Sequence, residues 1–195
     1  MRADAATLRL AAFPRPTFLT DALLVVSGTA LVSICAQISV KLPFTPVPIT
    51  GQTFAVCLVG ASLGAVRGAT SLTLYFLIGV LGAPVYAHHD HGWDVITSAS
   101  GGYIVGFVAA AAVTGALAEH RWDRRFSSAV GAMLTGNVVI YLVGLPWLAV
   151  VLNTNLEQTL EDGLYPFVPG DLFKLYCAAA LLPAAWRGVK YLDSR

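Results

Sequence analysis

Residues 126–156 read FSSAVGAMLTGNVVIYLVGLPWLAVVLNTNL, a run without a single Asp, Glu, Lys or Arg. An ionised side chain at the centre of a bilayer costs about 2.5 to 3.5 kcal/mol on insertion scales, so long uncharged runs are typical of membrane spans. A hydrocarbon core about 30 Å thick takes roughly 20 apolar residues of helix. This run therefore predicts a transmembrane helix.

Further runs without charge lie on both sides of this one. Together the runs are Ala22–Val40, Leu42–Val66, Gly68–His89, Val95–Ala118, Phe126–Leu156 and Gly163–Trp186, the last interrupted only by Asp171 and Lys174. The composition agrees, because 56% hydrophobic against 12% charged residues does not describe a soluble surface. The sequence predicts an all-α membrane protein, a six-transmembrane-helix bundle whose second and third helices are short.

The positive-inside rule orients the bundle, because cytoplasmic connections carry an excess of Lys and Arg. Ten of the twelve basic residues lie in the N-terminal segment, the turn at Arg67, the loop 120–125 and the C-terminal tail. The loops on the other side, 87–100 and 153–169, contain acidic residues and histidines but no Lys or Arg. Both termini are therefore predicted to be cytoplasmic, in a multi-pass protein of a bacterial-type cell membrane.

The predicted domain organisation is simple. Residues 1–20 form a cytoplasmic N-terminal segment, residues 21–190 a single six-helix transmembrane domain, and residues 191–195 a cytoplasmic tail. The first apolar run is long and lacks an A-x-A cleavage site, so we expect a retained span rather than a signal peptide.

Several function classes lose support from composition and motifs. A net charge of +1 with scattered basic residues gives no case for nucleic acid. The sequence has no GxxxxGK[ST] phosphate-binding loop, no GxSxG elbow and no HExxH pair. Its three cysteines lie in apolar stretches, where we expect packed thiols. We therefore expect that the protein is not an enzyme and that it has neither a cofactor nor a nucleic-acid partner. If it transports uphill, we expect a partner protein to supply the energy.

Asp171 and Lys174 are the strongest local anomaly, since ionisable residues inside an apolar span indicate function by default. Their spacing of three places them on one helical face. Pro169 and Gly170 precede them, so Asp171 is expected in the first helical turn, where the helix dipole favours a carboxylate. The pair either lines a polar pocket that opens outward, or serves the helix end while the lysine reaches the interface.

A second polar group lies in residues 41–53, KLPFTPVPITGQT, where three prolines impose an extended backbone. Irregular backbone at membrane depth must be buried in protein or line a cavity, so we expect this segment to wall a pocket. Thr50, Gln52 and Thr53 offer hydrogen bonds there, or they cap the second helix.

Other polar and small residues have competing interpretations. The run His88–His91 with Asp94 invites a metal site, but its adjacent side chains diverge, and a solvated outer loop is favoured. Asn137 and Tyr141, four apart, favour an interhelical hydrogen bond over a ligand contact. Two stripes of small residues predict either packing seams, which we favour, or a docking face for another membrane protein. The stripes are Gly60, Gly64, Gly68 and Gly102, Gly106, Ala110, Thr114.

Five motifs in order carry a family resemblance. They are PITGQT (48–53), GVLGAPVY (79–86), GGYIVGF (101–107), GNVVIYLVG (136–144) and PFVPGDLFK (166–174). Across about residues 30–190 the chain resembles the biotin-binding S component of energy-coupling-factor vitamin transporters, the BioY family. The resemblance implies six transmembrane helices, biotin held near the outer surface, a membrane-embedded T component and two cytoplasmic ABC ATPases as partners, which some members dispense with.

The resemblance also implies the substrate-binding residues. Asp171 and Lys174 match the family's Asp-x-x-Lys, and we expect Asp171 to accept from a ureido N–H of biotin while Lys174 neutralises Asp171 or meets an acceptor oxygen of the ligand. The complete predicted set is Thr50, Gln52, Tyr86, Gly102, Tyr103, Asn137, Asp171 and Lys174. The chain departs from the family at residues 87–100, where the family carries a glycine-rich stretch, and in the first span, where the small residues of a docking face are only partly present. The alternative is an S component for another vitamin or a transition-metal ion.

Overall fold

The computed structural model describes residues 7–13 and 17–193, with the side chains of residues 192 and 193 excepted. The elements in chain order are α1 Leu8–Ala12, α2 Phe18–Gln37, β1 Ser39–Val40, β2 Ile49–Thr50, α3 Gln52–Leu63, α4 Ala65–Val80, the 3-10 helix η2 Ala87–His89, α5 Trp93–Thr97, α6 Gly101–Glu119, α7 Phe126–Leu152, α8 Leu156–Gly163 and α9 Val168–Asp193. The predicted all-α membrane fold is confirmed. Each of the six longest of these helices lies mostly within a different one of the six runs.

Helix length separates the spans into two kinds. Helices α2, α6 and α7 are long and apolar enough to cross a membrane, and α8 with α9 forms a fourth candidate span bent by 50°. Helices α3 and α4 are shorter, with 12 and 16 residues. The prediction of short second and third helices is therefore confirmed, while α2 begins at Phe18, before the boundary expected at residue 21.

Proline and glycine explain why α3 and α4 are shorter than the uncharged runs that contain them. The proline-rich segment stays extended, as predicted, and β1 pairs with β2 antiparallel on either side of it, an addition that the sequence did not indicate. Gly64, with φ of +88°, joins α3 directly to α4. A side chain at Gly64 would strain this backbone. At the start of α4, the Glu119 carboxylate accepts a hydrogen bond from the Ala65 N–H at 2.9 Å.

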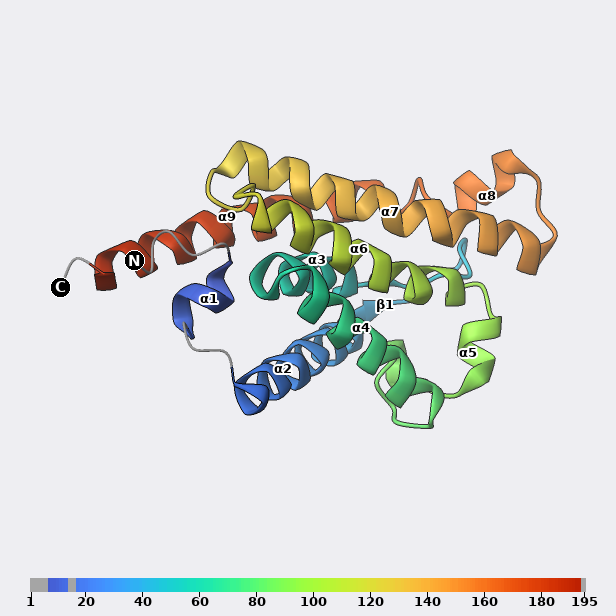
Figure 1. Cartoon of the computed structure of the whole chain (residues 1–195). Coiled ribbons are helices and arrows are strands. Elements are labelled where there is room, and N and C mark those ends of the chain that lie inside the picture. The colour runs from blue at the N-terminus through green and yellow to red at the C-terminus, as the bar shows by residue number, and fades with distance from the viewer. Residues whose placement is uncertain (1–6, 14–16, 194–195) are drawn as a thin grey trace.

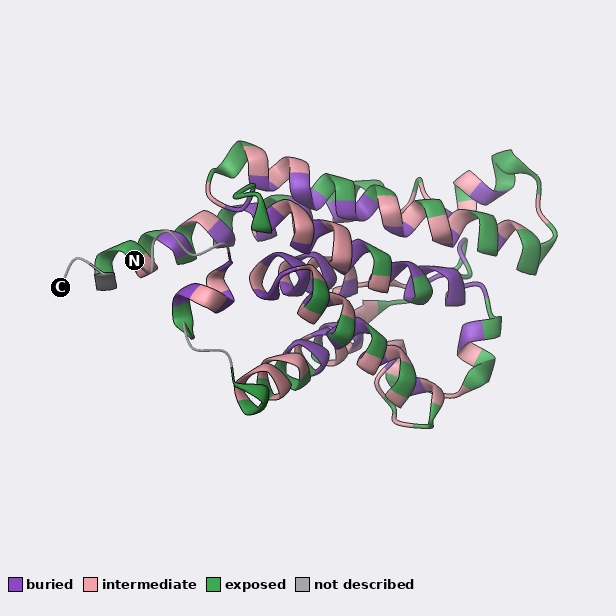
Figure 2. Ribbon diagram, in the orientation of Figure 1, coloured by how far each residue is buried: buried purple, intermediate pink, exposed green. Residues whose placement is uncertain are grey.

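Helix α6 is the centre of the bundle. In the most apolar 18-residue stretch of α6, 61% is buried, against 22% in α2 and 28% in α7. The outer faces of α2 and α7 carry exposed apolar side chains, such as Ile34 and Leu142, and Figure 2 shows exposed turns along both helices. Exposed apolar faces on outer helices are expected when the surrounding medium is lipid. The cysteines Cys35 and Cys57 are buried free thiols, as predicted, and Cys177 is half-buried.

The stripes of small residues are packing seams inside the bundle, as favoured from the sequence. A methyl group added to Gly60 would overlap the Thr114 side chain and the Ala111 carbonyl of α6, and one added to Gly68 would lie 2.8 Å from the Gly60 Cα. In the second stripe Gly102 and Gly106 face α7 instead. Close backbone approach at these glycines lets α3, α4 and α7 surround α6.

The two ends of the bundle differ in charge. Figure 1 shows α1, the α6–α7 connection and the last turns of α9 at one end, and α5 and α8 at the other. At the first end, which we term the basic end, the Asp21 carboxylate accepts hydrogen bonds from both Arg9 and Arg67, the latter at 2.8 Å. Arg9 is buried, so this network supplies the countercharge that a buried guanidinium requires. The cytoplasmic orientation of this end stays a prediction.

Candidate functional site

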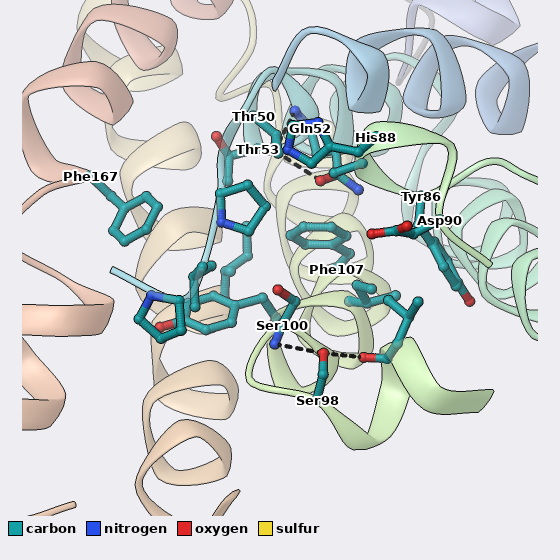
Figure 3. Close-up of a pocket in the computed structure, with 18 of the residues that line it drawn as sticks. Thr50, Gln52, Thr53, Tyr86, His88, Asp90, Ser98, Ser100, Phe107 and Phe167 are labelled. Carbon is teal, nitrogen blue, oxygen red and sulfur yellow. Dashed lines mark hydrogen bonds between the residues drawn. The ribbon is translucent and has the colours of Figure 1, made fainter. Parts of the chain in front are cut away.

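A cavity of about 450 Å³ lies between the proline-rich segment, the loop 86–100 and helices α6, α7 and α9. Figure 3 shows Thr53, His88, Ser98 and Phe167 around it, with Phe107 between them. The lining residues are Lys41, Pro46, Val47, Pro48, Thr50, Gln52, Thr53, Tyr86, Ala87, His88, Asp90, His91, Asp94, Val95, Ser98, Ser100, Tyr103, Ile104, Phe107, Ile140, Tyr141, Phe167, Asp171 and Lys174. The proline-rich segment therefore walls a pocket, as predicted.

Asp171 and Lys174 meet inside this cavity. Asp171 lies in the first turn of α9, as predicted, and is only 5% exposed. The Lys174 ammonium lies 2.7 Å from Asp171 Oδ1 and also donates to the Thr50 carbonyl oxygen at 2.8 Å and to the Thr53 hydroxyl at 3.2 Å. Of the two arrangements left open by the sequence, the structure has the pocket.

The hydrogen bonds of Asp171 and Lys174 leave an acceptor site free but no donor. An ammonium has three donors, and all three of Lys174 are used. The Asp171 carboxylate accepts from Lys174, from Thr53 at 3.0 Å and from the Tyr141 hydroxyl. Since a carboxylate offers about four lone-pair sites, Asp171 retains room for one further donor. The pair is therefore arranged to receive a hydrogen-bond donor from a ligand.

Thr50 and Gln52 lie at the start of α3, whose N-cap residue is Gly51 and has no side-chain cap. The Thr50 hydroxyl donates to Gln52 Oε1 at 2.8 Å and accepts from the Gln52 backbone N–H at 3.3 Å, which supports the start of the helix. Gln52 Nε2 in turn donates to the Tyr75 hydroxyl at 2.7 Å. Both residues line the cavity, so this chain of hydrogen bonds fixes its polar wall.

Tyr86 and Tyr103 line the cavity with their rings. Their hydroxyls donate away from it, to the Phe76 carbonyl at 2.8 Å and to the Gly163 carbonyl at 2.9 Å. Both side chains are buried, so these bonds hold the rings in place. The two tyrosines therefore contribute mainly apolar surface to the cavity wall.

Gly102 and Asn137 do not reach the cavity. Gly102 faces Trp147 on α7 and gives close packing rather than a ligand contact. Asn137 lies in a separate void of about 10 Å³ with Cys57 and Lys174, one helical turn from Tyr141. On α7 it is therefore Tyr141 that lines the cavity. The interhelical hydrogen bond that the sequence favoured for Tyr141 also exists, to Asp171.

The sequence favours a solvated outer loop for His88–His91, and this prediction holds for only part of the loop. His89 and His91 are exposed, whereas His88 is half-buried and lines the cavity, where its Nδ1 lies 3.2 Å from the Ser39 hydroxyl. The His88 Nε2 is buried without a hydrogen-bond partner among the described residues. His88 and His89 both adopt positive φ, near +61° and +63°. Within the described ranges no three His, Cys, Asp or Glu side chains converge as metal ligands would.

A family model, described as the BioY family, matches residues 5–191. The chain belongs to the BioY family. This member is 34% identical over 163 residues to the biotin transporter BioY of Rhizobium etli, across 80% of this chain and 87% of that one. It is 35% identical over 153 residues to the biotin transporter BioY of Thermotoga maritima, across 78% of this chain and 88% of that one.

A solved structure shares the fold of this BioY family member. It is the crystal structure of the S-component for biotin from an ECF-type ABC transporter, which matches with a TM-score of 0.76 at 23% identity and covers 87% of this chain and 94% of that one. The fold and the family together make the chain a multi-pass membrane protein.

Thr53, Phe107 and His88 are lining residues that the predicted set omits. Thr53 ends the PITGQT motif, and Phe107 follows Tyr103 by four residues, so helical spacing could have placed it on the same face. His88 had no such signal, because its inward direction depends on the positive φ of the loop.

Proposed function

We propose that this BioY family member captures biotin in the cavity of about 450 Å³ and delivers it across the cell membrane. One observation carries the proposal: the buried Asp171, paired with the half-buried Lys174, has spare acceptor capacity and faces a cavity lined by both polar and aromatic or aliphatic side chains. Ligand sites are usually pockets of about 300 to 1,000 Å³, and the volume of this cavity lies in that range.

Biotin suits this arrangement chemically. Its ureido group offers two N–H donors, and one of them fits the free acceptor site of the Asp171 carboxylate. Lys174 then acts through Asp171, holding the carboxylate in its orientation. The apolar bicycle of biotin lies against the rings of Tyr103 and Phe107, and burying it there contributes the hydrophobic part of the affinity.

The carboxylate tail of biotin extends towards the mouth of the cavity. Lys41 is exposed there, and His88 brings a buried ring nitrogen without a partner among the described residues. Both groups can donate to an anionic tail, which then lies apart from the Asp90 and Asp94 carboxylates that also line the cavity.

Transport against a gradient needs energy that the chain has no sequence motif to harvest, since no phosphate-binding loop occurs in it. We propose that a membrane-embedded T component and two cytoplasmic ABC ATPases supply it, and that the chain itself is a capture subunit and not an enzyme. Residues 21–190 then form the membrane domain, with residues 1–20 and 191–195 on the cytoplasmic side.

Biotin should raise the melting temperature of the detergent-solubilised protein. A ligand that binds only the native state adds about 2.7 kcal/mol to its stability at 100 times the dissociation constant. Thermal unfolding is to be followed with biotin, with thiamine and with no addition. A shift with biotin alone is expected; equal shifts with both vitamins, or none with saturating biotin, would refute the assignment of the substrate.

A further inference from the structure

A second concave site lies at the basic end of the bundle, away from the biotin cavity. It is a groove of about 690 Å³ between the start of α7 and the second half of α9. We term it the basic groove, and its lining residues are Arg121, Arg124, Arg125, Ser127, Ser128, Pro183, Trp186, Arg187 and Lys190. Five of these are cations and none is acidic, so the groove has a strong positive potential.

Most of these cations are not neutralised by the protein. Within the described ranges 7–13 and 17–193, four of the five form no salt bridge with another residue: Arg121, Arg125, Arg187 and Lys190. Like charges that share a concave surface repel one another, so an anion in the groove would stabilise it. Ser127 and Ser128 add hydroxyl groups that can donate to such an anion.

The floor of the groove is a fixed structure rather than a chance gathering of surface residues. Trp186 is 2% exposed, and its indole N–H donates to the buried carboxylate of Asp123. Burial raises the pKa of Asp123, against the opposing effects of the Trp186 hydrogen bond and the Arg124 charge. The Arg124 guanidinium lies 3.3 Å from the centroid of the Trp186 ring, so the arginine is held in place over the floor.

An apolar surface continues beside the cations. Phe126, the first residue of α7, stacks on Tyr176 of α9 with ring centroids 6.1 Å apart, and both side chains are about half exposed. Trp122 is also exposed next to the groove, as aromatic residues often are at a membrane interface. A small soluble anion would use only the cations, whereas a phospholipid would use both surfaces.

We propose that the basic groove binds the phosphate headgroup of an acidic phospholipid, with the acyl chains against the exposed faces of α7 and α9. Basic pockets between transmembrane helices on the cytoplasmic side bind such headgroups. Arg187 and Lys190 contact the phosphate from α9, and Arg125 contacts it from the start of α7. The lipid would thereby connect α7 and α9, which both line the biotin cavity, at the opposite end of the bundle from that cavity.

The test compares lipid retention in nanodiscs by native mass spectrometry. The wild-type protein is to be released from nanodiscs that contain phosphatidylglycerol or phosphatidylcholine, beside the double variant Arg187→Gln/Lys190→Gln. Since each cation near a membrane surface contributes about fivefold to the binding of anionic lipid, the double variant should retain phosphatidylglycerol about thirtyfold more weakly. The variant Lys41→Gln, which removes a cation at the other end of the bundle, should retain it like the wild type.

Three results would overturn the proposal. Equal retention of phosphatidylcholine by the wild type would remove the charge selectivity, and unchanged retention by the double variant would place the lipid elsewhere. Displacement of phosphatidylglycerol by millimolar inorganic phosphate would show a site for a free anion. Monodisperse elution of each variant in size-exclusion chromatography keeps a folding defect distinct from lost binding.

Discussion

Exchanging Asp171 for asparagine is expected to weaken biotin binding by about thirtyfold or more. The asparagine keeps the size of the side chain but loses the charge that three donors surround, namely Lys174, Thr53 and Tyr141. Removing one partner of a buried, hydrogen-bonded charge pair costs about 2 to 5 kcal/mol. Isothermal titration with biotin measures the loss. The exposed Glu161, which does not line the cavity, gives the matched control Glu161→Gln.

The variant Lys174→Ala tests how the two residues divide their roles. If Lys174 acts through Asp171, the double variant should bind biotin no more weakly than Asp171→Asn alone, because residues of one network are not additive. Additive losses would show instead that Lys174 contacts the ligand independently. Unchanged affinity in both single variants would remove the pair from the binding site.

The second large effect concerns the packing seam. Gly60→Ala should destabilise the protein by about 3 kcal/mol or more, because overpacking that moves a backbone exceeds the usual cost of about 1 to 3 kcal/mol. The added methyl group overlaps the Ala111 carbonyl and lies 2.9 Å from the Ala111 Cα, so helices α3 and α6 must separate. Unfolding in a denaturant series, or loss of monodisperse protein, measures the effect.

Gly188→Ala is the matched control for this prediction. A Cβ at Gly188, in the last part of α9, meets nothing within 4 Å, so the exchange should be neutral or stabilise by about 0.5 to 1 kcal/mol. Equal effects of the two exchanges would contradict the role of Gly60 in close helix packing.

The positions of the helices followed from the sequence because charge is costly in lipid at every depth of the core. The runs without charge located α2, α6, α7 and α9 well. They overestimated α3 and α4, since an uncharged run does not distinguish helix from extended chain, and the prolines before Gln52 and Pro84 after α4 keep those segments outside the helices. Charge patterns locate spans, and turn residues determine how much of each span is helical.

The cavity was predictable where the sequence forces polar groups together, and not where it depends on helix rotation. Asp171 and Lys174 share a helical face and cannot turn to lipid without large cost, so their cavity was expected. Asn137 and Tyr141 share a face of α7 as well, but their depth relative to Asp171 decides which one meets it. That depth depends on how α7 packs on α9, and the packing of two helices cannot be predicted from the pattern of a single sequence.

Native mass spectrometry of the freshly extracted protein tests the capture of biotin most directly. The protein is to be produced with biotin in the medium, purified in mild detergent and sprayed with and without added dethiobiotin, which keeps the ureido group. We predict one biotin per chain in the wild type, displaced by dethiobiotin and absent from Asp171→Asn. A wild-type protein without bound biotin even after incubation with excess ligand, or a variant that retains it fully, would contradict the account.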